Sequence, residues 1–374
     1  MILVIVIAVL AVGGAIAAGV TLSPVRGTPN TDVWVPALPV DDYIVTISKE
    51  EGKPFQVLNL TDIQFGDFHD IGKRTFTEDT IRAVIAETEP DLITLTGDQV
   101  WTKHSKYSIR HLVSFLDSFG IPWAPVMGNH DAEGNADAQY IADLYLDAEH
   151  CLFRKGPSNI GGVGNYVINI MEGNRIFHSL IMMDSGMGRS YSALGQDAIL
   201  SYELDDDFEL KRDGAGNPIE REIGHNFDFL SIGQIAWYRS VVERIKLHNQ
   251  SAGGGVPTSS LFLHIPLPEY YIAYVDYLLS GKDSSYGVFG ALREDVCCAK
   301  INSGMFDALL EGGSTKFVFA GHDYVNDLSI LYKGIRLTYG LKTGDRCYFE
   351  EGVNGGTLMT IGDTVEVRHV YVNP

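Results

Sequence analysis

Runs of apolar residues separated by polar turns divide the first third of the chain into alternating strands and helices. Three near-continuous apolar runs predict strands buried on both faces, at residues 55–60, 92–95 and 123–127. Two segments with helical spacing lie between them, at residues 76–88 and 108–119. The order strand–helix–strand–helix–strand predicts parallel strands with right-handed crossovers, so the expected fold class is α/β.

The remainder of the chain is less regular but mixes the same two kinds of element. Further strands are predicted at residues 43–47, 166–170, 177–183, 261–263, 316–320, 328–332, 335–339 and 366–371. Helices are predicted at residues 231–248 and 303–311. Residues 185–230 and 277–300 are polar or irregular and are interpreted as surface excursions. We therefore expect the α/β pattern to continue to the end of the chain.

The N-terminal residues differ in composition from everything that follows. Residues 1–20 contain no charged side chain, which suits a signal peptide or a membrane anchor within residues 1–25. A buried N-terminal strand or helix is the third alternative. Residues 26–42 contain three prolines and predict a linker. We expect one folded domain over residues 43–374, secreted or otherwise extracytoplasmic, with membrane contact only through the N-terminal segment.

Composition and charge narrow the range of partners. The chain has 374 residues, 45% of them hydrophobic, which is enough for a large core. Its formal net charge of −20 repels phosphate backbones, so nucleic acid is not an expected partner. Four cysteines, Cys151, Cys297, Cys298 and Cys347, could form up to two disulfides in an exported chain. No Cys-x-x-Cys spacing occurs, so a cysteine-based metal site is not expected.

Several predicted strands end in side chains that can bind a metal ion. Asp62, Asp98 and Asn129 follow the first three buried strands, and His264 and His322 follow two later ones. Because the carboxyl ends of parallel strands meet at one edge of a sheet, we expect these side chains to converge. Carboxylates combined with imidazoles suit Zn, Mn or Fe, and a shared carboxylate can bridge two ions about 3.5–4 Å apart. The pattern therefore predicts a metal centre of the hydrolytic type.

The motifs at these strand ends resemble those of the calcineurin-like metallophosphoesterase superfamily. They are Asp62-Ile63-Gln64, Gly97-Asp98, Gly128-Asn129-His130-Asp131, the strand-end His264 and Gly321-His322-Asp323-Tyr324. Residues 264–270 and 321–327 are similar to the branch related to purple acid phosphatases. The resemblance spans roughly residues 45–374. It implies a four-layer α/β/β/α sandwich of mixed sheets, with the metal site at the carboxyl ends of the strands.

The resemblance also implies which residues bind which ion. Asp98 would bridge two metal ions. Asn129, His264 and His322 would complete one site with it, and Asp62 would bind the other ion. Family members use two ions to activate a water molecule that attacks phosphorus. We therefore expect two divalent or mixed-valence ions of Mn, Zn or Fe.

The chain departs from the family pattern on the side of the ion assigned to Asp62. Gln64 and Tyr324 stand where the family usually has histidine, and Trp101 stands where purple acid phosphatases have a ligating tyrosine. Gln64 offers a neutral amide oxygen. Tyr324 would bind only as a phenolate, and its reference pKa of about 10 requires a strongly acidic ion. We expect this second site to be the weaker one.

Two functional interpretations are compatible with these motifs. The first is a phosphomonoesterase or phosphodiesterase in which His130 stabilises developing charge or protonates the leaving oxygen, and Asp131 orients the His130 ring. The second is a degenerate, catalytically weak member that binds one metal ion or a phosphorylated ligand without turnover. A small phosphoester is the expected substrate, and Lys342, Thr343 and Arg336 are candidates for phosphate contacts.

Overall fold

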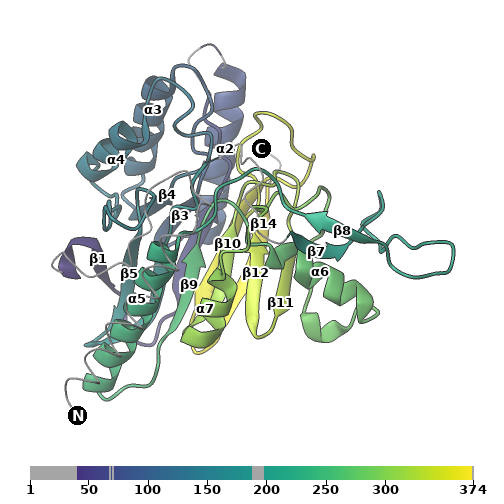
Figure 1. The fold of residues 1–374 in the computed structure, drawn as a ribbon. Coiled ribbons are helices and arrows are strands. Elements are labelled where there is room, and N and C mark those ends of the chain that lie inside the picture. The colour runs from purple at the N-terminus through teal and green to yellow at the C-terminus, as the bar shows by residue number, and fades with distance from the viewer. Residues whose placement is uncertain (1–39, 67–68, 70, 188–197, 373–374) are drawn as a thin grey trace, which may run out of the picture.

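The computed structural model describes residues 40–66, 69, 71–187 and 198–372 (Figure 1). The expected signal or anchor segment and most of the expected linker lie outside the described residues. Among the described helices, none combines the length and the apolar composition needed to cross a membrane.

One sheet collects the three parallel strands that the first apolar runs predicted. Its five strands lie in the order β14-β13-β2-β3-β4. The parallel strands are β2 (Phe55–Leu60), β3 (Leu92–Thr96) and β4 (Trp123–Val126). The antiparallel strands β13 (Gly355–Ile361) and β14 (Val365–Tyr371) extend the sheet beyond β2. Almost every side chain of the parallel strands is buried, which explains why their sequences are continuous apolar runs.

A second sheet of seven strands supplies the other half of the core. Its order is β1-β5-β6-β9-β10-β12-β11. The strands are β1 (Ile44–Ser48), β5 (Tyr166–Glu172), β6 (Arg175–Met182), β9 (Thr258–Phe262), β10 (Thr315–Ala320), β11 (Ser329–Tyr332) and β12 (Ile335–Tyr339). Strands β6, β9, β10 and β12 are parallel to one another, so the carboxyl ends of β9 and β10 lie at the same edge.

The two sheets pack face to face between two layers of helices (Figure 1). On the five-stranded sheet lie α2 (Ile71–Thr88), α3 (Ser105–Asp117) and α4 (Ala138–Asp147); on the seven-stranded sheet lie α5 (Ile232–Ser251), α6 (Glu269–Leu279) and α7 (Met305–Gly312). Hydrogen bonds cross between the sheets, from the Tyr166 hydroxyl to the Pro125 carbonyl at 2.8 Å and from the Ser260 hydroxyl to the Met359 sulfur at 3.3 Å. The predicted α/β/β/α sandwich is confirmed.

Helix α6 and strand β13 are among the elements that the hydrophobic pattern did not predict. Helix α6 follows Pro268 directly, in a stretch that the sequence interpretation divided between a motif and a surface excursion. Proline is favoured at the start of a helix because its missing N–H is not needed there. Strand β13 begins with Gly355 and Gly356, which by themselves indicate a turn. Helix α2 also begins at Ile71, earlier than the predicted residue 76.

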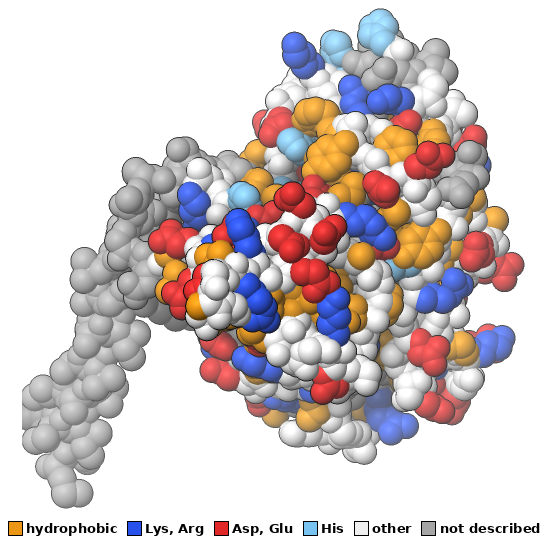
Figure 2. All heavy atoms as spheres, turned by 90° about the vertical axis from the view of Figure 1, so that its right-hand side faces the viewer, with side chains coloured by type: hydrophobic (Ala, Val, Ile, Leu, Met, Phe, Trp, Pro, Cys, Tyr) orange, Lys and Arg blue, Asp and Glu red, His pale blue; other side chains and the backbone are white. Residues whose placement is uncertain are grey.

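The polar segment at residues 185–230 does lie at the surface in its described part. It forms the hairpin β7 (Ile199–Tyr202) and β8 (Glu220–Ile223), which pairs with neither large sheet. On the face that carries this hairpin, acidic side chains are interspersed with Lys and Arg (Figure 2). In the structure all four cysteines are free thiols, so neither of the two possible disulfides is formed.

Candidate metal centre

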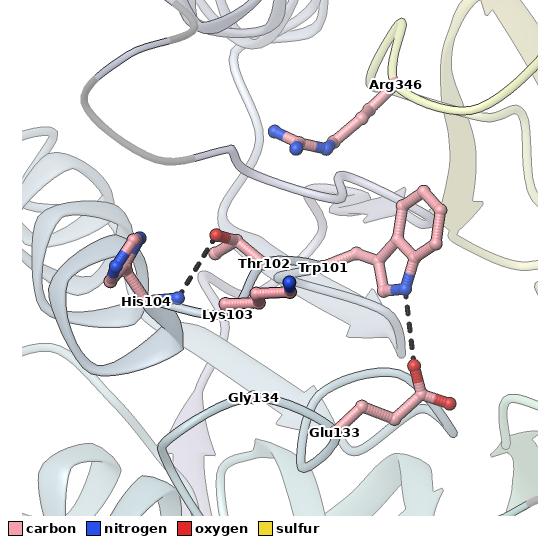
Figure 3. A pocket seen from close by; sticks show the side chains of 7 residues that line it. All are labelled: Trp101, Thr102, Lys103, His104, Glu133, Gly134 and Arg346. Carbon is pink, nitrogen blue, oxygen red and sulfur yellow. Dashed lines mark hydrogen bonds between the residues drawn. The ribbon is translucent and has the colours of Figure 1, made fainter.

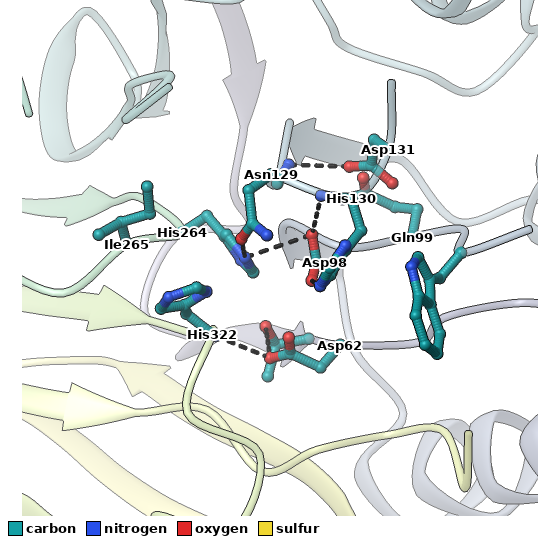
Figure 4. Close-up of polar contacts among 12 residues, drawn as sticks. Asp62, Asp98, Gln99, Asn129, His130, Asp131, His264, Ile265 and His322 are labelled. Carbon is teal, nitrogen blue, oxygen red and sulfur yellow. Dashed lines mark hydrogen bonds and ion pairs between the residues drawn. The ribbon is translucent and has the colours of Figure 1, made fainter. Parts of the chain in front are cut away.

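The strand ends of both sheets converge on one place between them (Figure 4). Asp62, Asp98 and Asn129 follow β2, β3 and β4 of the five-stranded sheet, and His264 and His322 follow β9 and β10 of the seven-stranded sheet. The sequence interpretation placed Asp62, Asp98 and Asn129 at one edge of a sheet, as the structure has them. It did not assign His264 and His322 to a sheet, and the structure places these imidazoles on the other one.

Ligand atoms of three buried residues form the centre of this cluster. One ligand atom each from Asp62, Asp98 and His264 lie within 4.8 Å of one another. The Nε2 atom of His264 is 2.9 Å from the Asn129 amide oxygen and 3.3 Å from Asp98 Oδ1. Its other ring nitrogen, Nδ1, is 2.8 Å from the Thr96 carbonyl oxygen. A backbone carbonyl on Nδ1 orients the ring so that Nε2 is directed at the ion site.

His322 completes the same side of the cluster. Its backbone N–H donates to Asp62 Oδ2 at 3.0 Å, and its ring centre lies 5.0 Å from that of His264. Among the described residues, neither ring nitrogen of His322 has a hydrogen-bond partner, and the same is true of the buried atoms Asp62 Oδ1 and Asp98 Oδ2. Buried polar atoms without partners are rare and costly. The donor set therefore fits a bound metal ion, which would satisfy these atoms.

The backbone at three of these positions has a conformation that side chains rarely adopt. Asp62, Asp98 and His322 have φ angles of 49°, 52° and 80°. Such left-handed conformations cost on the order of 1–3 kcal/mol each and cluster at functional sites. The cost is offset here by the placement of three charged or ligating side chains toward one point.

Two glycines allow these strand ends to approach one another. A Cβ atom on Gly97 would lie 2.3 Å from His264 Nδ1, and one on Gly128 would lie 2.2 Å from Asp98 Oδ1. Real Cβ atoms are not found so close to other heavy atoms. The glycines of the Gly97-Asp98 and Gly128-Asn129 motifs therefore have a steric role, because they leave room for the ligand of a neighbouring strand.

The charges of the buried cluster depend on one another. Burial opposes ionisation of Asp98, but His264 outweighs it and holds the pKa of Asp98 below its ordinary value. Burial likewise opposes protonation of His264, yet Asp98, helped by Asp62, raises the pKa of His264 to about 10. Burial, with His264 acting in the same direction, keeps the pKa of His322 well below its ordinary value. Burial raises the pKa of Asp62, and Asp98 adds to this effect.

His130 lies beside the cluster and is held by a residue that the sequence interpretation missed. Its backbone N–H donates to Asp98 Oδ1 at 2.9 Å, and its ring Nε2 is 3.9 Å from Asp98 Oδ2. Its ring Nδ1 lies 2.7 Å from a carboxylate oxygen of Glu133, which also accepts from the Trp101 indole N–H at 3.2 Å. The His130 Nε2 atom is therefore left on the side of the metal ligands.

The role expected for Asp131 differs from what the structure shows. Its carboxylate accepts hydrogen bonds from the backbone N–H groups of Gly128 at 2.8 Å and Val100 at 2.9 Å. Burial, with a contribution from Asp98, raises its pKa to about 8. Asp131 thus fixes the loop that carries Asn129, whereas Glu133 is the residue that contacts the His130 ring.

The other side of the cluster has a different chemistry. The Gln64 amide N–H donates to the Tyr324 hydroxyl at 2.5 Å, and the Lys342 ammonium donates to the Gln64 amide oxygen at 2.8 Å. Burial, increased in effect by Asp98 and Asp62, raises the pKa of Tyr324, so a phenolate is disfavoured. Burial lowers the pKa of Lys342, while Asp62 opposes that shift. Gln64 and Tyr324 are near Asp62 as expected, but they are bonded to each other.

The structure places Lys342, Thr343 and Arg336, the candidates for phosphate contacts, against neighbouring protein groups. Lys342 is buried beside Asp62, and the Thr343 hydroxyl donates to the Gly355 carbonyl at 3.0 Å. The Arg336 guanidinium donates to the Gly287 carbonyl at 3.1 Å. In the structure, these three side chains bond to neighbouring protein groups.

An open cavity is lined by Trp101 and its neighbours (Figure 3), and the Trp101 ring centre lies 5.3 Å from that of His130. It has a volume of about 430 Å³. Its lining residues are Trp101, Thr102, Lys103, His104, Glu133, Gly134 and Arg346. Two of them are cationic, and two contact His130, so the cavity lies beside His130 and has positive charge in its wall.

The fold and the cluster together define a metal-dependent phosphoesterase-type centre. The sequence model of the family described as calcineurin-like phosphoesterase matches residues 62–326. The chain belongs to this family, on the branch related to purple acid phosphatases.

The chain is also similar in sequence or in fold to individual proteins of known name. The chain is 27% identical over 335 residues to "Probable inactive purple acid phosphatase 14" of Arabidopsis thaliana, covering 86% of this chain and 74% of the relative. It is 28% identical over 296 residues to "Probable inactive purple acid phosphatase 29" of the same plant, covering 76% and 67%. A dimetal phosphatase structure from Danio rerio shares the fold, with a TM-score of 0.50 and 12% identity over 84% of this chain and 96% of that one.

Proposed function

We propose that this protein is a metal-dependent phosphoric ester hydrolase that acts on small phosphomonoesters or phosphodiesters. The observation that carries the proposal is the set of unsatisfied ligand atoms on Asp62, Asp98 and His322, next to His264 and Asn129. An Mn, Zn or Fe ion bound there would polarise the phosphoryl group and lower the pKa of a bound water molecule. Export of the domain, through the segment before residue 26, is part of the same proposal.

The residues around the ion site have separable tasks in this proposal. Asp98, Asn129, His264 and His322 hold the ion. The Glu133 carboxylate accepts from His130 Nδ1, which fixes the ring so that Nε2 faces the phosphoryl group. From there, Nε2 donates a proton to the leaving oxygen or stabilises the charge that develops on the phosphoryl oxygens.

The cavity beside His130 supports a small organic phosphoester as the substrate. The Trp101 ring offers an apolar surface, and Lys103 and Arg346 offer positive charge within the same cavity. A volume of about 430 Å³ is within the usual range for small-molecule sites. The net charge of −20 makes nucleic acid a poor substrate.

A second candidate function is binding without turnover. Gln64 and Tyr324 are bonded to each other beside Asp62, which leaves only one side of the cluster rich in ligands. The two Arabidopsis relatives are also named as probable inactive phosphatases. In this alternative the chain holds one ion or a phosphorylated ligand without turnover.

Hydrolysis of an aryl phosphate and of the corresponding diester distinguishes the two functions. The protein is loaded in turn with Mn²⁺, Zn²⁺ and iron, and metal content is measured on the same samples. We expect turnover that falls by about 10²–10⁴-fold in His130→Ala, the usual contribution of a general acid or base. His248→Ala, on the distant helix α5, is the matched control and should leave the rate unchanged. A filled metal site with no turnover would support the binding function.

A further inference from the structure

The buried side chain of Lys342 lies in the half of the centre that contains Gln64 and Tyr324. Its ammonium donates to the Gln64 amide oxygen at 2.8 Å and to the Asp62 carbonyl oxygen at 3.2 Å. It also lies 4.0 Å from the centre of the Tyr324 ring. Only 2% of Lys342 is exposed. Lysine is almost never so fully buried unless it is paired, which indicates that this charge belongs to the site.

The backbone holds Lys342 in register with the strand end that carries Asp62. Lys342 forms a parallel bridge with Thr61, the residue before Asp62. The Thr343 N–H donates to the Thr61 carbonyl at 2.9 Å, and the Gly355 N–H donates to the Lys342 carbonyl at 3.1 Å. The position of the ammonium therefore follows from main-chain pairing on both sides of the residue.

The groups around Lys342 are those that a second metal ion would need. Asp62 keeps a buried carboxylate oxygen without a hydrogen-bond partner among the described residues, but one oxygen of this carboxylate lies within 4.8 Å of ligand atoms of Asp98 and His264, on the side of the first ion. The Gln64 oxygen accepts from Lys342, and the Tyr324 hydroxyl accepts from the Gln64 N–H. Both neutral groups are thus engaged with partners of their own. The residues present do not fit a second ion as they fit the first.

The formal charges of the centre also disfavour a second metal ion. With His264 neutral, as it must be when an ion binds its ring, the carboxylates of Asp62 and Asp98 and the ammonium of Lys342 give the centre a formal charge of minus one. One divalent ion makes it one unit positive, which suits an anionic phosphoester. A second divalent ion would make it three units positive beside a buried ammonium, where low polarity strengthens the repulsion.

We propose that the Lys342 ammonium takes the place of the second metal ion, so that the chain binds one divalent ion per molecule. This replaces the expectation of two ions. The inference deepens the proposed function, since it concerns the same centre. Its test counts ions and needs no turnover, so its failure is distinguishable from failure of the hydrolase proposal.

The wild-type protein gives the first test. Metal-free full-length chain is titrated with Mn²⁺ at neutral pH. Calorimetry gives the number of ions, and electron paramagnetic resonance distinguishes an isolated ion from a spin-coupled pair. We expect one ion per chain and the spectrum of an isolated ion. Two ions per chain with a coupled spectrum would overturn the proposal, and this result requires no variant to fold.

A pair of variants then isolates the ammonium. Gln64→His with Tyr324→His introduces two imidazoles but keeps Lys342, and we expect it to bind one ion. Adding Lys342→Met should raise the count to two and produce the coupled spectrum. Adding Lys316→Met instead, at an exposed position on β10, is the matched control and should leave the count at one.

Either of two results in these variants contradicts the proposal. The first is a second ion in the variant that keeps Lys342. The second is a single ion in the variant that loses it. The first ion, whose ligands Asn129, His264 and His322 are unchanged, reports in every variant that the centre has folded.

Discussion

The two halves of the candidate metal centre, one around His264 and His322 and one around Gln64 and Lys342, differ in how their polar atoms are satisfied. In one half, His322 has two ring nitrogens without hydrogen-bond partners, and His264 directs Nε2 toward Asp98 and Asn129. In the other half, Lys342 and Gln64 are joined by hydrogen bonds to neighbouring groups. The unpartnered nitrogens of His322 in the first half are available to an ion. The polar groups of the second half are already hydrogen-bonded to one another.

On the proposal above, a second carboxylate does not by itself make a second metal site. Asp62 and Asp98 are both buried in the cluster, and each has one carboxylate oxygen without a partner. What separates the halves is the neutral donors beside the carboxylates. Fully connected polar networks are stabilised by their own hydrogen bonds and resist reorganisation around an ion. In this proposal the half around His264 and His322 is the metal site, and the half around Gln64 and Lys342 is a structural polar network.

The largest expected effect comes from removing one imidazole from the ligand-rich half. We expect His264→Ala to weaken Mn²⁺ binding by at least about 100-fold, because even residues that only orient metal ligands contribute about 10–100-fold. The matched change in the other half, Gln64→Ala, should alter Mn²⁺ affinity by no more than about threefold. Isothermal titration calorimetry on both variants measures the difference. Equal losses in the two variants would show that both halves bind the ion.

The next effect concerns the pH dependence of ion binding. The pKa of His264 is raised to about 10, chiefly by Asp98 against the effect of burial, so the metal-free protein carries a proton on this ring at neutral pH. An ion that binds Nε2 must displace that proton, and affinity should therefore rise by about tenfold per pH unit below pH 10. The pKa of His322 is well below its ordinary value, so this ring should release no proton when the ion binds.

Proton release can be measured directly. Titration of Mn²⁺ between pH 6 and pH 8, in two buffers with different ionisation enthalpies, gives the number of protons released per ion. We expect one. A value of zero, together with an affinity independent of pH, would mean that His264 is neutral before the ion binds.

The sequence was sufficient to predict the ligand-rich half because strand periodicity places residues at strand ends. Asp62, Asp98 and Asn129 each follow a buried apolar run, and the parallel order brings them to one edge. The assignment of His264 and His322 to a second sheet was not predictable in this way. Apolar runs show that a strand is buried, but they do not show which sheet it joins.

The polar network around Lys342 could not be predicted for a different reason. Lys342 contacts Gln64, a residue 278 positions away in the chain, and a buried lysine has no local pattern that distinguishes it from an exposed one. Strand β13, which holds the backbone of Lys342, was also missed because Gly355 and Gly356 resemble a turn. Contacts that depend on an unpredicted strand are themselves unpredictable.

The smallest expected effect separates the two carboxylates that follow His130. Glu133 contacts the His130 ring, whereas Asp131 bonds only to backbone N–H groups in the structure. We expect Glu133→Gln to lower kcat by about tenfold and to leave KM and Mn²⁺ affinity unchanged. The effect is moderate because half of the Glu133 side chain is exposed, so its loss removes only part of the orientation of the His130 ring. Asp131→Asn should instead weaken Mn²⁺ binding, because it loosens the loop that carries Asn129. Steady-state kinetics at saturating metal concentration measure kcat and KM of both variants, and calorimetry measures their Mn²⁺ affinity. A lower kcat at unchanged metal affinity in Asp131→Asn alone would restore the role for Asp131 that the sequence first suggested.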